Sequence, residues 1–186
     1  MITIGADIHL HCEYRRDGVW YNCDNFEWDP KTEEYEFTSI YSDRNYDLFG
    51  VLAGVRSATC EQIDEPRGLP KDMATKTREM AEVDKEWTHS HSYLTMRELL
   101  RWREKQKLKW KKYKKQKGNK IVHTDYDGDL IYNSEGVPLM LKYEKHVCDN
   151  LIRKMKDKMN DHVFCFEEED YYLKGDDFRI VFWFDS

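Results

Sequence analysis

The chain has 186 residues, of which 40% are hydrophobic, 14% aromatic and 35% charged. So many aromatic residues are not typical of a disordered chain, and the longest uncharged apolar run, residues 48–55, is far shorter than the roughly 20 residues of a membrane span. Residues 1–15 carry Asp7 and two histidines where a signal peptide has an apolar core. The five cysteines contain no CxxC pair, which indicates reduced thiols rather than a disulfide framework or a zinc knuckle. Membrane, secreted and fibrous classes are therefore excluded.

The charge is unevenly distributed along the chain. The net charge is −6, but residues 101–120 hold 11 basic residues and one acidic residue, so that segment carries +10 and the rest carries −16. This asymmetry predicts a basic projection on an acidic body.

The first 40 residues predict strands. Polar and apolar residues alternate over residues 7–14, which is the period of a half-buried strand. Asp17-Gly18 supplies a two-residue turn, so residues 6–23 predict a hairpin, and residues 26–38 predict a second one. Together they indicate an antiparallel sheet with one solvated face.

The remaining elements alternate between helix and strand. A helix capped by Ser42 or Asp43 is predicted up to Val55, a short helix over residues 73–86, and an extended segment over 87–93. Thr95 caps a long helix that ends near Gly118. A turn-rich strand pair over 121–135, a helix of about 20 residues beyond Pro138, and strands over 163–166 and 178–184 complete the prediction.

These elements predict one α+β domain over residues 1–186. Its antiparallel sheet is built from strands at the N- and C-terminal ends and is covered by helices, with a projecting basic helix. Residues 103–135, comprising the basic helix and the turn-rich hairpin, are predicted to be an insertion.

Asp7, His9, His11 and Glu13 point to one side of the first predicted strand. Imidazole and carboxylate groups are ligands that suit zinc or manganese. The competing interpretation is an ordinary solvated strand face, which is expected to be polar.

A second pair of imidazoles, His89 and His91, is expected on one side of the extended segment after Trp87. If both pairs meet, they form a divalent metal site that activates water near neutral pH. The alternative is two separate surface pairs, since spacing does not determine tertiary contact.

Arg44, Arg56 and Arg67 are candidates for binding an anionic ligand. Arg67 lies in the stiff turn of residues 66–70, which contains two prolines, and a guanidinium there can bind phosphate or carboxylate. Structural salt bridges are the alternative use of these arginines.

The basic stretch 101–120 is interleaved with Trp102, Trp110 and Tyr113, which is typical of a nucleic-acid-binding helix. The alternative is a solvated helix that packs on the acidic body of its own chain or of a neighbouring copy.

Several segments together resemble a known family. They are GADIH at residues 5–9, the segment from RNYDLF at 44–49 to Arg56, PRGLP at 66–70, HSHSYL at 89–94 and RIVFWFD at 179–185. They resemble a family of small proteins encoded by bacteriophages and prophages, in which a cysteine stands at the place of Ala6. The resemblance implies an accessory protein of a phage that works in the host cytoplasm, with action against a bacterial defence system as one role. It implies no catalytic residues.

Three functions remain open from the sequence. The first is a metal-assisted hydrolase of a phosphate-bearing small molecule or nucleotide, in which Glu13 or Asp185 is the general base and Arg67 holds the anion. The second is a non-catalytic protein that sequesters a nucleotide signal or inhibits a host defence protein. The third is a nucleic-acid-binding module that uses the basic helix. We expect no membrane partner, and we expect a homo-oligomer.

Overall fold

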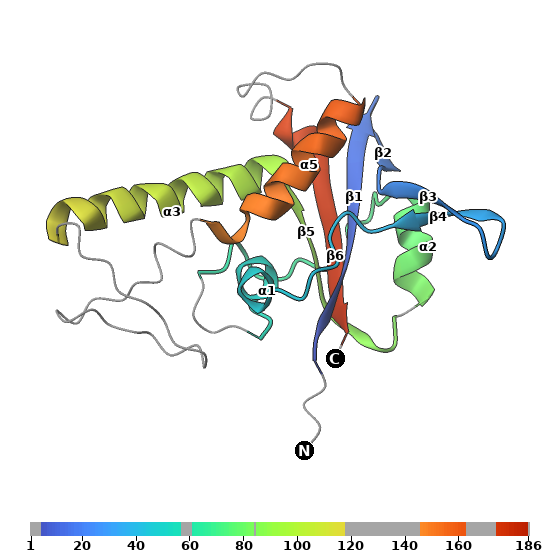
Figure 1. The fold of residues 1–186 in the computed structure, drawn as a ribbon, viewed down its shortest axis with the longest axis horizontal. Coiled ribbons are helices and arrows are strands. Elements are labelled where there is room, and N and C mark those ends of the chain that lie inside the picture. The colour runs from blue at the N-terminus through green and yellow to red at the C-terminus, as the bar shows by residue number, and fades with distance from the viewer. Residues whose placement is uncertain (1–4, 57–60, 84, 118–145, 163–173, 186) are drawn as a thin grey trace. The chain divides into compact units, whose positions relative to one another are not determined.

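A computed structural model describes residues 5–56, 61–83, 85–117 (110–117 by their backbone alone), 146–162 and 174–185. It has a four-stranded antiparallel sheet in the order β2-β1-β6-β5 (Figure 1). The strands are β1 (Asp7–Arg16), β2 (Val19–Asn22), β5 (Thr88–Thr95) and β6 (Phe178–Asp185). The predicted α+β class is confirmed: strands from near the two ends of the chain form the centre of the sheet, and β5 joins them from the middle of the chain.

The chain divides into two compact units. The first comprises Met1–Arg44, Pro66–Arg97 and Arg153–Ser186, and the second comprises Asn45–Glu65 and Glu98–Ile152. The sheet belongs to the first unit. The predicted insertion falls in the second unit, and its residues 118–135 lie outside the described part of the chain.

The two central strands pair over their full shared length, from Asp7 opposite Asp185 to Tyr14 opposite Phe178. Every residue of β6 except Asp185 is buried, as its nearly unbroken apolar sequence predicts. The middle of β1 differs from the expected half-buried strand, because residues 10–13 are buried on both faces. The tertiary structure supplies the reason: His11 and Glu13 have hydrogen-bonding partners there, Asp24 and the distant Arg179, so their burial leaves no unpaired polar group.

The hairpin of β3 (Asn25–Asp29) and β4 (Glu34–Thr38) forms a sheet of its own. The prediction of two strands was correct, but the prediction that they join the first hairpin in one sheet was wrong. Cys23 still donates its backbone N–H to Cys12, at 2.8 Å, but the Cys12 N–H is taken by the Asp24 carboxylate, at 2.7 Å. The Asp24 side chain therefore ends the β1–β2 ladder where a longer ladder would continue.

The described helices are α1 (Tyr46–Ala53), α2 (Thr75–Val83), α3 (Met96–Lys117) and α5 (Asp149–His162), with a short 3₁₀ turn over Gly175–Asp177. The helices expected near residues 46–55, 73–86 and 96–117 are confirmed, the second over the shorter range of α2. The predicted cap of the first was wrong: Asn45 caps α1, because its side chain accepts a hydrogen bond from the Leu48 N–H at 3.1 Å.

Some predictions lie outside the described residues: the strand pair at 121–135, the strand at 163–166 and the first half of the helix beyond Pro138. Among the helices that the structure does describe, none combines the length and the apolar character needed to cross a bilayer.

Candidate functional site

One face of the sheet carries almost all of the chemistry predicted from the sequence. Because residues directly opposite each other in antiparallel strands share a face, the pairing of β1, β6 and β5 places their side chains in rows across the sheet. From one end to the other the rows are Asp7–Asp185–Thr88, His9–Trp183–His91, His11–Val181–Tyr93 and Glu13–Arg179–Thr95. The row of His91 holds a bulge, described below. We call the Glu13 end the closed end and the Asp185 end the open end.

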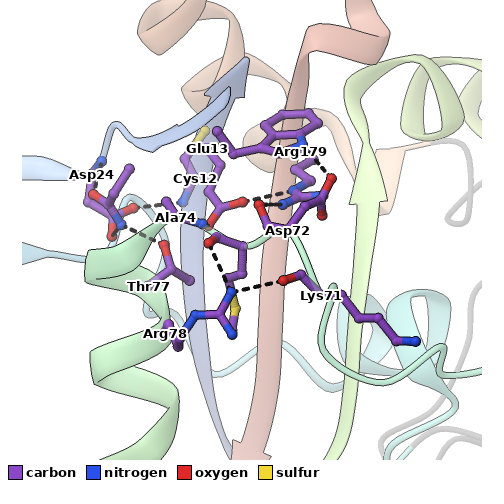
Figure 2. A network of polar contacts seen from close by, with 12 residues as sticks. Cys12, Glu13, Asp24, Lys71, Asp72, Ala74, Thr77, Arg78 and Arg179 are labelled. Carbon is purple, nitrogen blue, oxygen red and sulfur yellow. Dashed lines mark hydrogen bonds and ion pairs between the residues drawn. The ribbon is translucent and has the colours of Figure 1, made fainter. Parts of the chain in front are cut away.

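The closed end is an ion network in which Glu13 and Arg179 are buried and Asp72 is 66% exposed (Figure 2). The Glu13 side chain is fully buried; one of its oxygens accepts from Arg179 Nε at 2.8 Å and the other from the Ala74 N–H at 2.9 Å. Arg179 also donates to Asp72 at 3.0 Å, and its guanidinium carbon lies 3.8 Å from the centroid of the Trp20 ring. Trp20 in turn donates its indole N–H to Asp72 at 3.0 Å. Every charged group of this network therefore has a partner of opposite charge.

Two pKa directions follow from contacts in this part of the molecule. Partial burial alone would raise the pKa of Asp72, but the hydrogen bonds from Arg179 and Trp20 and the positive charge of Arg179 lower it. Next to the network, the hydrogen bond with Cys23, burial and nearby negative charge raise the pKa of the Cys12 thiol well above its usual value. Cys12 is therefore a neutral, buried thiol rather than a nucleophile.

This arrangement corrects the role expected for Glu13. A general base must reach a substrate or water, whereas the Glu13 carboxylate is fully buried and each of its oxygens binds a donor of the protein. Glu13 instead fixes the segment before α2 to the sheet through Ala74 and holds Arg179 in place.

His11 lies in the middle of the face and is held by Asp24. Its Nδ1 lies 2.7 Å from Asp24 Oδ2, and the same carboxylate accepts from the backbone of Cys12 and from Asn22 at 2.9 Å. Because a carboxylate accepts and does not donate, the Nδ1 of a neutral His11 carries the proton and Nε2 is an acceptor. The sequence did not single out Asp24, since an aspartate between two strands is typical of an ordinary turn.

Trp183 is the centre of the open end. The His9 ring stacks on it at 5.8 Å between centroids and 8° between planes, the His11 ring lies at 5.0 Å, and the His91 ring lies at 6.2 Å. Trp183 is 1% exposed, yet its indole N–H has no hydrogen-bond partner among the described residues. We call these three imidazoles with Trp183 the imidazole cluster. The sequence did not single out Trp183, although alternation along β6 places it on the same face as Arg179 and Asp185.

A β-bulge brings His91 to this cluster. His89 is opposite Phe184 and Ser92 is opposite Phe182, so two residues of β5, Ser90 and His91, stand against Trp183. Ser90 has φ 52°, a left-handed conformation that is uncommon for a residue with a side chain.

The bulge also separates the two histidines of β5. The His89 ring lies 6.2 Å from that of Phe184, on the face opposite to the imidazole cluster. The expectation that His89 and His91 share one side of the strand was therefore wrong. His9, His11 and His91 do share a face, but Trp183 stands between the histidines of β1 and the one of β5.

The other groups at the open end form pairs. His9 Nε2 lies 3.2 Å from Asp185 Oδ2, and the two side chains are 33% and 41% exposed. Asp185 also accepts from the Asp7 N–H at 3.0 Å. Arg44 binds both carboxylate oxygens of Asp7, at 2.6 and 2.5 Å, and this hydrogen bonding holds the Asp7 pKa below its usual value. Arg44 is thus already engaged by a carboxylate.

His91 Nε2 lies 3.1 Å from the Thr88 hydroxyl. Burial, with the nearby charges of His89 and Lys85, lowers the pKa of His91. The loop that carries Arg67 runs beside this strand, because Gly68 donates its N–H to the His91 carbonyl at 2.9 Å. Lys85 and Arg67 are thus the basic side chains near this part of β5.

Two of the three predicted arginines, Arg44 and Arg67, belong to the first unit, and Arg56 belongs to the second. The Arg67 guanidinium donates to the Tyr93 carbonyl at 3.3 Å and lies 5.4 Å from the Tyr93 ring. Arg56 follows α1 in the second unit, exposed and with φ 59°.

The predicted metal ligands form pairs rather than a preformed cage. Across the part of the chain that the structure describes, no three side chains of histidine, cysteine, aspartate or glutamate are grouped so that they could hold a metal ion. His9 and Asp185 are the pair that could contribute two ligands.

The basic stretch forms α3, whose positive charge is partly paired. Glu61 accepts from Lys105 at 2.5 Å, from Gln106 at 3.1 Å and from Lys109. Arg103 lies near Asp149, at 3.9 Å. The side chains of residues 110–120 lie outside the described part of the chain, so a nucleic-acid interface on this helix stays a prediction.

Comparisons of the chain with models of protein families, with curated proteins and with solved structures gave no match.

Proposed function

We propose that this protein is an accessory protein of a bacteriophage that acts in the host cytoplasm by binding, without cleaving, a phosphate-bearing small molecule or nucleotide at the open end of the sheet. The phage context rests on the sequence resemblance alone. The binding role rests on one observation: three imidazoles surround Trp183, whose buried N–H has no partner among the described residues.

The indole N–H of Trp183 supplies the energetic reason for binding. A buried donor without an acceptor costs about 1–3 kcal/mol, so this site is stabilised by an oxygen that accepts from Trp183. His9 and His91 flank the indole and are both partly exposed. Movement of either imidazole ring would therefore give a ligand oxygen access to the Trp183 Nε1. The ring N–H groups of the imidazoles and the Lys85 ammonium then donate to the remaining ligand oxygens.

Aromatic side chains near the open end suit a nucleotide. Trp87 is 78% exposed and directly precedes Thr88, the hydroxyl partner of His91. An exposed indole beside phosphate-binding groups can stack on a base, and such stacking contributes about 1–3 kcal/mol.

The binding test is calorimetric titration with inorganic phosphate, adenosine mono-, di- and triphosphate, and cyclic dinucleotides. We expect at least one nucleotide to bind, and we expect His91→Gln and Trp183→Phe to weaken its binding at least about tenfold, or about 1.4 kcal/mol. His146→Gln is the matched control, because His146 is also an exposed imidazole beside a carboxylate, 2.7 Å from Asp149, but belongs to the second unit. Equal loss in the control, or no binding of any of these compounds, would contradict the proposal.

A second candidate is the metal-assisted hydrolase, and the His9–Asp185 pair favours it. These two partly exposed side chains could supply two ligands to zinc or manganese, with the phosphate of the substrate and water as the others. Chromatography of the nucleotide after incubation with added zinc or manganese distinguishes the two functions. Recovery of intact nucleotide supports sequestration, whereas cleavage that His9→Gln abolishes supports hydrolysis.

A further inference from the structure

The hairpin of β3 and β4 has two chemically opposite faces. Its register pairs Phe26 with Phe37 and Trp28 with Tyr35, so one face is entirely aromatic. The alternate positions pair Glu27 with Glu36 and Asp29 with Glu34, so the other face is acidic. We call these four acids and four aromatic residues the hairpin surface: Phe26, Glu27, Trp28, Asp29, Glu34, Tyr35, Glu36 and Phe37.

Both faces are open. Phe26, Trp28 and Tyr35 are 57%, 51% and 58% exposed, and the two glutamate partners on the acidic face, Glu27 and Glu36, are exposed as well. The rings contact one another, with Phe26 and Tyr35 stacked at 4.6 Å, so they form one patch rather than scattered residues. A contiguous exposed apolar patch is typical of an interaction site.

The acidic face carries an electrostatic cost that a partner can remove. Carboxylates directly opposite each other on neighbouring strands repel, and an isolated two-stranded sheet is only marginally stable. A basic and partly apolar partner on the aromatic face would cover the rings, and its positive charge would reduce the repulsion among the acids across the thin two-stranded sheet. The aromatic face already contacts one such cation, because Lys76 Nζ lies 5.5 Å from the centroid of the Phe37 ring.

The chain itself contains a segment of that chemistry. Residues 101–117 of α3 contain ten lysines or arginines and one acid. Arg101, Lys105 and Leu108 are all exposed, Leu108 at 57%, and their spacing of four and three residues places them on one side of the helix. Although Lys105 and Lys109 are paired, they share the single carboxylate of Glu61, so the helix keeps an excess of positive charge.

We propose that the hairpin surface of one copy binds the exposed side of α3 of a second copy. Leu108 packs on the aromatic face, Arg101 and Lys105 lie over its rings, and the acids on the other face of the hairpin add attraction at longer range. In a twofold dimer the contact occurs twice. The hairpin surface differs in its chemistry from the nucleotide site, and this dimer does not depend on the proposed function.

The first test is sedimentation of the full chain at increasing protein concentration. We expect reversible dimers whose dissociation constant rises at least about tenfold between roughly 50 and 500 mM salt, because screening weakens contacts between charges. A single monomeric species at every concentration would overturn the proposal.

Two variants then identify the surfaces. Trp28→Ser removes the largest exposed ring of the hairpin, and Arg101→Glu with Leu108→Glu reverses the character of the helix. Each is expected to abolish dimers, and circular dichroism and thermal unfolding show whether each variant remains folded. Lys31→Ala, at the turn of the hairpin, is a matched exposed control that should dimerise like the wild type.

Mixing the two variants is the decisive measurement. The Trp28→Ser copy keeps an intact helix and the Arg101→Glu, Leu108→Glu copy keeps an intact hairpin, so a mixture can form one of the two contacts. We expect dimers in the mixture, weaker than those of the wild type, and none in either variant alone. If the helix variant dimerises alone as well as the wild type does, two hairpins pack on each other instead and the proposal is wrong.

Discussion

The two ends of one sheet face differ in how their buried polar groups are paired. At the closed end the buried Glu13 and Arg179 pair with each other, and Arg179 also binds the exposed Asp72. At the open end the polar side chains are partly exposed, one buried donor is unpaired among the described residues and a serine holds a left-handed conformation. Polar residues on one strand face therefore stabilise the fold at the closed end, and at the open end they are the residues for which we propose binding. Four substitutions test this division, in order of expected effect.

Breaking the closed end should cost most. Arg179→Met leaves the buried Glu13 carboxylate without its cation, and we expect the free energy of unfolding to fall by about 3–5 kcal/mol in urea denaturation. Adding Glu13→Gln should recover much of the loss, because the uncompensated charge is then gone. Arg15→Met is the matched control on the same sheet: its pair with Asp177 is 41% and 38% exposed, so its loss should cost less than about 1 kcal/mol. If Arg179→Met and Arg15→Met lowered the free energy of unfolding equally, the closed end would not be a special source of stability.

The next effect concerns the carboxylate that holds His11. The fully buried Asp24 carboxylate accepts from His11, Cys12 and Asn22. Asp24→Asn turns one of its two acceptor oxygens into an NH₂ donor, which cannot accept from them. We expect a loss of about 1–3 kcal/mol. Asp185→Asn, the matched change at the open end, should cost less than about 1 kcal/mol, because Asp185 is 41% exposed and water replaces the lost bonds.

Relief of strain at the bulge should stabilise the protein slightly. Ser90→Gly removes the side chain from a residue with φ 52°, together with its hydrogen bond with His89 Nδ1 at 2.9 Å. Because that lost bond and the flexibility of glycine in the unfolded chain oppose the relief of strain, we expect a net gain of at most about 0.5 kcal/mol in the free energy of unfolding. Ser92→Gly, two residues along the same strand, should instead destabilise, because Ser92 is buried and accepts from the Arg67 N–H at 3.2 Å. Weaker nucleotide binding by the more stable Ser90→Gly variant would link the strain to function.

The smallest effect is a change in pH dependence. Because the pKa of His91 is lower in the folded protein than in the unfolded chain, the unfolded chain binds this proton more readily. His91 therefore contributes stability above its ordinary pKa of about 6.5, and this contribution is lost as pH falls through the lowered value. His91→Gln should flatten the decline of the urea midpoint on acidification from neutral pH. An unchanged slope would show that His91 does not titrate as its surroundings indicate.

Local spacing predicted the strands and most helices because alternation and capping act within a few residues. It also placed His9, His11 and Glu13 on one face. It could not predict which residues lie across from them, because the register of β1 against β6 depends on packing between segments far apart in the chain. The bulge at Ser90 could not be predicted for a related reason. No glycine stands at this position of positive φ, and the bulge depends on the pairing of β5 with β6.

The pairing of Asp7 with Asp185 has a consequence for synthesis of the chain. These residues are 178 positions apart, so at about 5–20 residues per second a ribosome needs roughly 10–35 s after β1 before its central neighbour exists. During that interval the apolar side of β1 is covered by no more than local structure, and a hairpin of β1 and β2 alone is marginal. We therefore expect chaperones to bind the nascent chain and cover the exposed β1 until β6 has been synthesised.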